Sequence, residues 1–194
     1  MSDLDVDADG RFRCSWAGSA PEYVEYHDLE WGRPVHGDEA LFERLTLEAF
    51  QSGLSWLTIL RKRESFRAAF AGFEIDAVAA FTDADRARLL ADPGIVRNTA
   101  KVNAAIANAR AAAALRDGDG VGALDALIWS FQPSAGPAPW RMGDVPAAVP
   151  ESAALAKELK RRGFVFVGPT TMYALMQAVG MVNDHLAGCF RRAG

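Results

Sequence analysis

The chain has 194 residues, of which half are hydrophobic and 24% are charged. A chain of this length and composition can bury a sizeable core and form one or two compact domains. No apolar run approaches the roughly 18 residues that a membrane span needs, and the first ten residues, MSDLDVDADG, are acidic where a secretory signal would be basic and then apolar. The composition therefore argues against a membrane protein, and we expect a cytoplasmic location.

The formal net charge of −4 comes from the N-terminal segment alone. Residues 11–194 are neutral overall, because Asp3, Asp5, Asp7 and Asp9 together carry −4. Three short basic clusters lie on this neutral remainder, at 61–63, 160–162 and 191–192. Clusters of this kind permit a contact with a nucleic acid, although short charge runs are more often solvated surface.

The pattern of apolar residues predicts an all-α fold. Residues 1–11 are polar and Asp-rich, which is typical of a disordered tail. The 3.6-residue period and the start and stop signals predict helices over 38–52, 54–69, 76–81, 84–91, 98–115, 123–131, 151–162 and 169–179. Asp38 should cap the first of these, and Thr82 with Asp85 has the form of a capping box. Residues 132–150 are rich in proline and predict an irregular connection, and FVFV at 164–167 reads as a strand without a partner.

A short turn, DPGIVRN, joins two of the predicted helices and must fold the second back on the first. It resembles the hairpin of a helix-hairpin-helix element, in which backbone N–H groups and a helix N-terminus bind a DNA phosphate. The proline, Gly94 and Ile95 match the start of that pattern, whereas Val96 replaces its usual second glycine. Arg97 and Lys101 could add positive charge to such a contact. An ordinary corner between two helices is the alternative.

Two cysteines and two histidines have a spacing that suits a metal ion. His185 and Cys189 are four residues apart in NDHLAGC, whereas Cys14 and His27 lie near the other end of the chain. A closed Cys2His2 tetrahedron would leave no position for a catalytic water, so the metal would be a structural zinc joining the two ends. The alternative is that both thiols are buried and both histidines are ordinary. His36 has no such partners and suits the surface.

Aromatic residues crowd around one carboxylate. Glu48 interrupts an apolar helical run, LEAFQSGLSW, and the aromatic residues of this region are Trp16, Tyr23, Tyr26, Trp31 and Trp56. Such a set can form a pocket for a flat, cationic ring through stacking and cation–π attraction. The alternatives are an aromatic core and a solvated helix glutamate.

Several motifs together resemble the 3-methyladenine DNA glycosylase I family. They include RCSWAG, YHDLEWG, LEAFQSGLSW, GIVRNTAKVNAAIANARA and GMVNDH, and the similarity extends over nearly the whole of residues 13–189. The resemblance implies a helix-hairpin-helix glycosylase fold and a monofunctional repair enzyme. Such an enzyme hydrolyses the N-glycosidic bond of 3-methyladenine in alkylated double-stranded DNA and releases the free base.

The resemblance also implies roles for individual residues. It assigns a structural zinc, one per chain, to Cys14, His27, His185 and Cys189. It assigns the base pocket to Trp16, Tyr23, Tyr26, Glu48 and Trp56, with Trp31 beside it. Leu54 matches the position that fills the gap left by the extruded nucleotide, and it joins Gly94, Ile95, Arg97 and Lys101 as a DNA-contacting residue. Glu48 is the candidate catalytic residue, and the sequence leaves open whether it cleaves the bond or only recognises the base.

The expected organisation is one catalytic unit over 12–194, active as a monomer. A hairpin-containing subdomain would span about 40–131, and a zinc-bearing subdomain would combine 12–39 with 132–194. A non-catalytic, zinc-stabilised helix-hairpin-helix module that binds DNA is the rival interpretation, because it would need the hairpin and the metal but not the Glu48 pocket. A generic helical interaction protein would need neither.

Overall fold

The computed structural model describes residues 3–6 and 10–192, and this part of the chain is mostly helical. Its α-helices are α1 (Pro21–Leu29), α2 (Asp38–Gln51), α3 (Trp56–Ala69), α4 (Ile75–Ala79), α5 (Asp83–Ala91), α6 (Thr99–Asp119), α7 (Ala123–Trp129), α8 (Pro150–Arg161) and α9 (Pro169–Ala178). The shorter elements are the strands β1 (Leu4–Val6) and β2 (Phe12–Cys14) and the 3-10 turns η1 (Ser15–Ser19), η2 (Ala71–Phe73) and η3 (Met142–Asp144). Within the described residues, no helix combines the length and the hydropathy that crossing a membrane requires.

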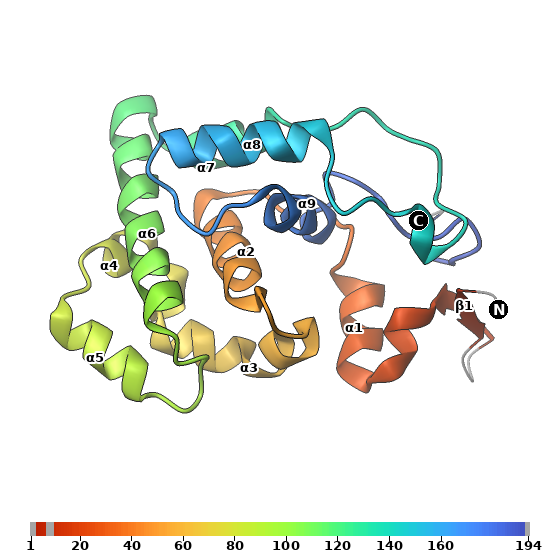
Figure 1. The fold of residues 1–194 in the computed structure, drawn as a ribbon, viewed down its shortest axis with the longest axis horizontal. Coiled ribbons are helices and arrows are strands. Elements are labelled where there is room, and N and C mark those ends of the chain that lie inside the picture. The colour runs from red at the N-terminus through yellow and green to blue at the C-terminus, as the bar shows by residue number, and fades with distance from the viewer. Residues whose placement is uncertain (1–2, 7–9, 193–194) are drawn as a thin grey trace.

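Helix α2 lies at the centre of the molecule (Figure 1). It packs against α3, α6, α7 and α9, and apolar side chains on several of its sides are fully buried, among them Leu41, Phe42, Leu45 and Leu47. The helices α4, α5 and α6 lie on one side of α2, whereas α1 and both ends of the chain lie on the other (Figure 1). Glu48 lies near the C-terminal end of this buried helix and is itself 5% exposed.

Most of the predicted helices are present with shifts of a few residues at their ends. The side chains of Thr82 and Asp85 form the predicted capping box of α5. Helix α6 extends beyond the predicted end to Asp119, and Gly120, with φ of +94°, ends it. Helix α1 was missed, because its buried residues, Tyr26 and His27, are adjacent and do not form a 3.6-residue stripe.

The prediction that Asp38 caps its own helix is wrong. Gly37 is the N-cap residue of α2, and no side chain among the described residues caps that end. The carboxylate of Asp38 instead accepts hydrogen bonds from the backbone N–H groups of Gly122 and Asp125, at 3.0 and 2.9 Å. Asp38 therefore satisfies the free N–H groups at the start of α7, a helix remote in sequence but adjacent in space.

The prediction of a strand over 164–167 is also wrong. Phe164 and Val167 are buried and the two residues between them are half-exposed, but none of the four pairs with another strand. The side chain of Asn108 takes the place of a partner strand, because its Oδ1 accepts from the N–H of Val165 and its Nδ2 donates to the Val165 carbonyl. Phe166 has φ of +58°, which ends any extended run.

The expected disorder over 1–11 is wrong for Leu4–Val6, which form β1 and pair antiparallel with β2. Leu4 packs against the small cluster of Cys14, Leu186 and Cys189, so that this one apolar side chain anchors the acidic segment. The rest of the predicted tail lies partly outside the described residues, at 1–2 and 7–9.

Candidate functional site

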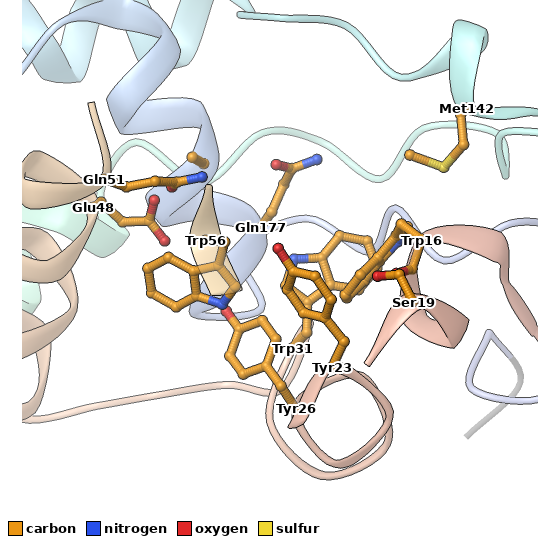
Figure 2. Close-up of a pocket in the computed structure, with 11 residues that line it drawn as sticks. Trp16, Ser19, Tyr23, Tyr26, Trp31, Glu48, Gln51, Trp56, Met142 and Gln177 are labelled. Carbon is orange, nitrogen blue, oxygen red and sulfur yellow. The ribbon is translucent and has the colours of Figure 1, made fainter. Parts of the chain in front are cut away.

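An aromatic cavity of about 380 Å³ lies where α1, the end of α2, the start of α3 and the last turns of α9 meet. The residues that line it are Trp16, Ser19, Tyr23, Tyr26, Trp31, Glu48, Gln51, Trp56, Met142, Ala174 and Gln177. All five predicted pocket residues, and Trp31 beside them, are therefore brought to one place (Figure 2). We refer to this space as the aromatic cavity.

Glu48 is the buried acid of the aromatic cavity. It is 5% exposed, and no donor among the described residues forms a hydrogen bond with its carboxylate. Burial raises the pKa of Glu48 to about 8, and the charge of Arg44, one helical turn earlier, lowers it in part. The guanidinium of Arg44 itself donates to Glu30 at 2.7 Å. Glu48 therefore keeps unused acceptor atoms beside the cavity, where a bound ligand with a positive charge or N–H groups would stabilise its ionised form.

The aromatic walls are held in place by contacts with one another and by one hydrogen bond from α3. The ring of Trp16 meets the rings of Tyr23 and Trp31 edge to face, with centroids 5.5 and 5.1 Å apart. The Tyr26 and Trp56 rings are tilted, with centroids 5.4 Å apart. Tyr23 accepts a hydrogen bond from the backbone N–H of Leu57 at 2.9 Å, which ties α1 to α3. Burial and the nearby Glu48 raise the pKa of Tyr26, so its hydroxyl stays protonated.

Four residues of the cavity were not predicted: Ser19, Met142, Ala174 and Gln177. Gln177 had a signal that could have revealed it, because it is a polar residue in the mostly apolar helix PTTMYALMQA, just as Glu48 is in α2. Gln51, a suggested neighbour of Glu48, lines the cavity, whereas Ser52 is exposed outside it. Met142 comes from the proline-rich connection, whose path the sequence does not specify.

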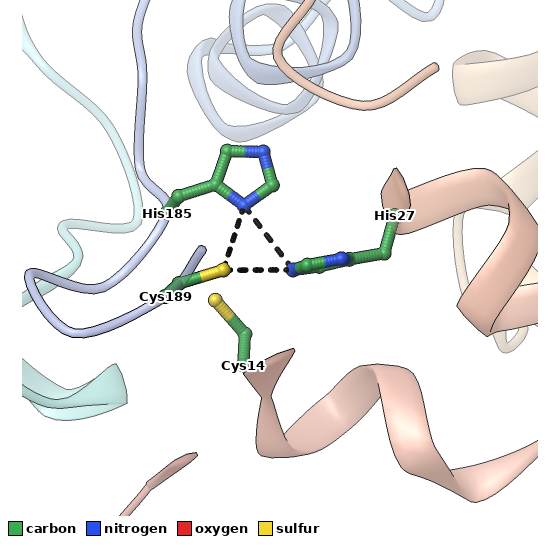
Figure 3. Close-up of side chains that lie close together, drawn as sticks. All are labelled: Cys14, His27, His185 and Cys189. Carbon is green, nitrogen blue, oxygen red and sulfur yellow. Dashed lines mark hydrogen bonds between the residues drawn. The ribbon is translucent and has the colours of Figure 1, made fainter. Parts of the chain in front are cut away.

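The four predicted metal ligands converge in a second, fully buried site (Figure 3). Their ligand atoms all lie within 4.8 Å of one another. The Nδ1 of His185 is 3.2 Å from the Nε2 of His27, and the Sγ of Cys189 is 3.4 Å from that same nitrogen. Separations of this size suit four atoms around one tetrahedral ion. We refer to Cys14, His27, His185 and Cys189 as the Cys2His2 cluster.

The surroundings of the Cys2His2 cluster also suit a metal. The free ring nitrogen of His27, Nδ1, lies 2.8 Å from the carboxylate of Asp28, which Arg13 also contacts at 2.8 Å. The free ring nitrogen of His185, Nε2, lies 3.2 Å from the backbone carbonyl of Trp31. Acceptors at these positions fix the ring tautomers that direct the other nitrogen of each ring to a metal. His36 lies elsewhere, 61% exposed, as expected.

The predicted DNA-contacting residues lie on two surface loops. The turn between α5 and α6 needs Gly94, because a Cβ there would come within 2.9 Å of Asp92 Oδ1 and 3.0 Å of the Ser65 Cβ. Arg97 is exposed in this turn, whereas Ile95 is buried and anchors it. Leu54, 40% exposed, lies in the loop between α2 and α3.

Lys101 lies differently from the other predicted DNA-contacting residues. It is 7% exposed, and its Nζ donates to the carbonyls of Phe50 and Ser52 at 2.8 and 2.6 Å. These bonds satisfy carbonyl groups at the C-terminal end of α2. This buried position does not favour the predicted phosphate contact. Lys101 instead stabilises the C-terminal end of α2, the helix that carries Glu48.

The structure defines a small helical protein that combines a helical hairpin, an aromatic cavity with a buried acid and a buried Cys2His2 cluster. A family model described as methyladenine glycosylase matches residues 16–192. DNA-3-methyladenine glycosylase 1 of Escherichia coli (strain K12) is 45% identical over 180 residues, which cover 91% of this chain and 95% of that protein.

Solved structures agree with this match. A crystal structure of a 3-methyladenine DNA glycosylase I superposes with a TM-score of 0.87 at 44% identity, covering 92% of this chain and 98% of the other. A tyrosine-to-phenylalanine variant of such an enzyme, solved in complex with 3-methyladenine, gives a TM-score of 0.86 at 33% identity, covering 93% and 97%. The chain belongs to the methyladenine glycosylase family.

Proposed function

We propose that the protein is a DNA-3-methyladenine glycosylase that hydrolyses the bond between the methylated base and its deoxyribose. The observation that carries this proposal is Glu48, a buried carboxylate that accepts no hydrogen bond from the described part of the chain, on the wall of a cavity that is otherwise largely aromatic. Burying an acid in this way costs free energy unless a ligand compensates it. A positively charged base would compensate the negative charge of Glu48 and donate N–H hydrogen bonds to its oxygens.

Selection of the damaged base follows from its charge. Methylation at N3 makes the adenine of the nucleotide cationic, and a cation over the faces of tryptophan and tyrosine gains about 0.5 to 2 kcal/mol per contact. A charge-assisted hydrogen bond to Glu48 adds about 1.5 to 3 kcal/mol. A neutral adenine gains less from both, so the aromatic cavity discriminates between the two.

Base extrusion precedes this selection. A base inside a duplex cannot reach a buried pocket, so the nucleotide must leave the stack, at less cost when it is damaged. Leu54 is exposed beside the cavity on the α2–α3 loop, and in our proposal it fills the gap in the duplex. The hairpin turn with Gly94 and Ile95 holds the backbone phosphates, and Arg97 adds its charge.

Cleavage of the glycosidic bond needs less catalytic assistance from the protein, because a cationic base is already a good leaving group. The aromatic cavity holds the base in place and excludes water from its faces. We assign Glu48 to the base itself, where its negative charge orients the ring for departure.

A structural zinc ion is part of the proposal. Cys14, His27, His185 and Cys189 would hold it, with all four positions taken by protein atoms and none left for a substrate or a water. The ion would contribute folding free energy and no chemistry. It would fix α1, which carries Tyr23 and Tyr26, against the C-terminal segment.

The deciding experiment is incubation of the protein with methylated double-stranded DNA, followed by chromatography of the released bases. We expect free 3-methyladenine and intact strands. A folded, zinc-loaded sample that binds this DNA but releases no base would instead be the non-catalytic DNA-binding module.

Size-exclusion chromatography on the same sample tests the proposed monomer. Because the substrate is cellular DNA, we keep the cytoplasmic location within the proposal.

A further inference from the structure

Gln177 has no role in the recognition described so far, yet it lines the same cavity as Glu48 (Figure 2). It belongs to the last turn of α9, a helix whose other residues are mostly apolar. Its side chain offers both a donor, the Nε2 amide, and an acceptor, the Oε1 oxygen. Which of the two faces a ligand decides what kind of ligand the residue can recognise.

The structure fixes this orientation through Asp184. The Nε2 of Gln177 donates to the Oδ2 of Asp184 at 2.8 Å, and the hydroxyl of Tyr173 donates to the same oxygen at 2.7 Å. A carboxylate oxygen accepts hydrogen bonds, so the nitrogen end of the amide must face Asp184. The oxygen end is then turned away from Asp184, and in Figure 2 it points to the side on which Glu48 and Gln51 lie.

The main chain of Gln177 is equally constrained. Its carbonyl accepts from the N–H of Gly32 at 3.1 Å, the residue that follows Trp31 of the cavity wall. Three residues later, Gly180 packs so closely against the segment after α1 that a Cβ there would lie 2.4 Å from the carbonyl carbon of Arg33. A side chain held from both its backbone and its amide nitrogen loses little entropy when it binds, which is a requirement of a recognition group.

The aromatic cavity therefore has two acceptors with unused capacity. Among the described residues, no donor forms a hydrogen bond with Gln177 Oε1 or with the Glu48 carboxylate. Neither group is among the fully buried polar atoms that lack a partner, so both remain accessible from the cavity. Two acceptors suit a ligand group with two N–H bonds. The exocyclic amino group of an adenine is such a group, whereas a guanine-type or hypoxanthine-type base has a carbonyl oxygen at that position.

We propose that Gln177 is a specificity-determining residue, whose Oε1 accepts a hydrogen bond from the exocyclic amino group of the extruded base. A base with a carbonyl there would bring two acceptors face to face and leave both unpaired, which is how polar sites reject near-isosteres. The inference rests on the proposed function, since it names the group of the substrate that the same cavity reads.

The test compares two free bases of the same size, 3-methyladenine with an amino group at this position and 3-methylhypoxanthine with a carbonyl oxygen there and one added ring N–H. Isothermal titration calorimetry gives the dissociation constants for the wild type and for Gln177→Met, which keeps the length of the side chain but has no amide. We expect the wild type to prefer 3-methyladenine. Compared with the wild type, the variant should bind 3-methyladenine roughly 10-fold more weakly and 3-methylhypoxanthine with nearly the same affinity. The preference for 3-methyladenine should therefore fall roughly 10-fold.

Gln132→Met is the matched control. This glutamine donates to the Met181 carbonyl at 3.3 Å and does not line the aromatic cavity, so its loss should leave the preference unchanged. A purely structural role for Gln177 would weaken both bases equally, and that result would overturn the inference. So would an unchanged preference in Gln177→Met.

A structure of the wild type with 3-methyladenine provides an independent answer should the variant not fold. A distance of 3.5 Å or less between Oε1 and the amino nitrogen, the usual limit for a hydrogen bond, would support the inference, and a longer one would overturn it. The proposed function fails separately, if the wild type releases no 3-methyladenine from methylated DNA.

Discussion

The Nε2 of His27 lies 3.4 Å from the Sγ of Cys189, although 162 positions separate the two residues in the sequence. His27 belongs to α1, the helix whose other residues Tyr23 and Tyr26 line the aromatic cavity. Cys189 belongs to the segment that follows α9, the helix that carries Gln177. The cluster thus joins the two parts of the chain between which the cavity forms.

Elemental analysis of the purified protein should find one zinc ion per chain. Exchange of Cys14 for serine should abolish the zinc and lower the midpoint of thermal unfolding, because three ligands hold the ion poorly and the buried polar groups lose their partner. His36→Ala is the control, since this third histidine is 61% exposed and outside the cluster. An unchanged midpoint in a zinc-free Cys14→Ser protein would contradict the structural role.

Glu48→Gln should lower kcat/KM for release of 3-methyladenine from methylated DNA by about 10- to 150-fold, which corresponds to one charge-assisted hydrogen bond of about 1.5 to 3 kcal/mol. The amide keeps the shape of the acid but not its charge. Single-turnover kinetics with saturating protein separates the two candidate roles of Glu48. A loss confined to binding assigns the residue to recognition, whereas a slower step at saturation assigns it to bond cleavage as well.

The stability of the protein without ligand should depend on pH through Glu48. Its pKa rises from 4.5 to about 8 on folding, because burial penalises the charged form. Between these values the folded state keeps a proton that the unfolded state has lost, so the free energy of unfolding falls as pH rises, by up to about 1.4 kcal/mol per pH unit. Urea unfolding of wild type and Glu48→Gln from pH 4 to pH 9 should show this difference in slope. Parallel curves would refute the shift.

Leu54→Ala should reduce kcat/KM on methylated duplex DNA by roughly 3- to 30-fold, since a smaller side chain supports the gap in the duplex less well. Affinity for free 3-methyladenine should not change, because Leu54 does not line the aromatic cavity. Val121→Ala provides the comparison, an apolar side chain that is 94% exposed on a loop away from the cavity. Equal losses in both variants would mean that Leu54 has no special part in base extrusion.

Local signals in the sequence predict the helices well but not their partners in space. The capping box of Thr82 and the alanine-rich run of α6 depend only on neighbours in the chain, and both were predicted correctly. Asp38 and Asn108 were misjudged or overlooked, because their side chains bond backbone groups 84 and 57 positions away. The strand expected at 164–167 fails for the same reason.

The same distinction between local signals and contacts remote in sequence applies to the candidate site. Residues of unusual chemistry, such as Glu48 in an apolar helix or the paired cysteines and histidines, could be found because their types are rare in such surroundings. Met142 could not be found, since it reaches the cavity from an irregular connection whose conformation depends on the rest of the fold. The charge of Lys101 suggested a phosphate contact, whereas its length lets it reach the carbonyls at the end of α2, which the sequence did not reveal.

Trp31 belongs to both sites at once. Its ring lines the aromatic cavity and lies 4.6 Å from the ring of His185, centroid to centroid, and its carbonyl faces the Nε2 of that histidine. Indole emission is sensitive to nearby charges and to stacking, and the chain has five tryptophans, so the difference in emission between the wild type and Trp31→Phe should respond both to loss of the ion and to arrival of a base. Trp31 thereby links the two sites through one side chain, whose emission reports on each of them.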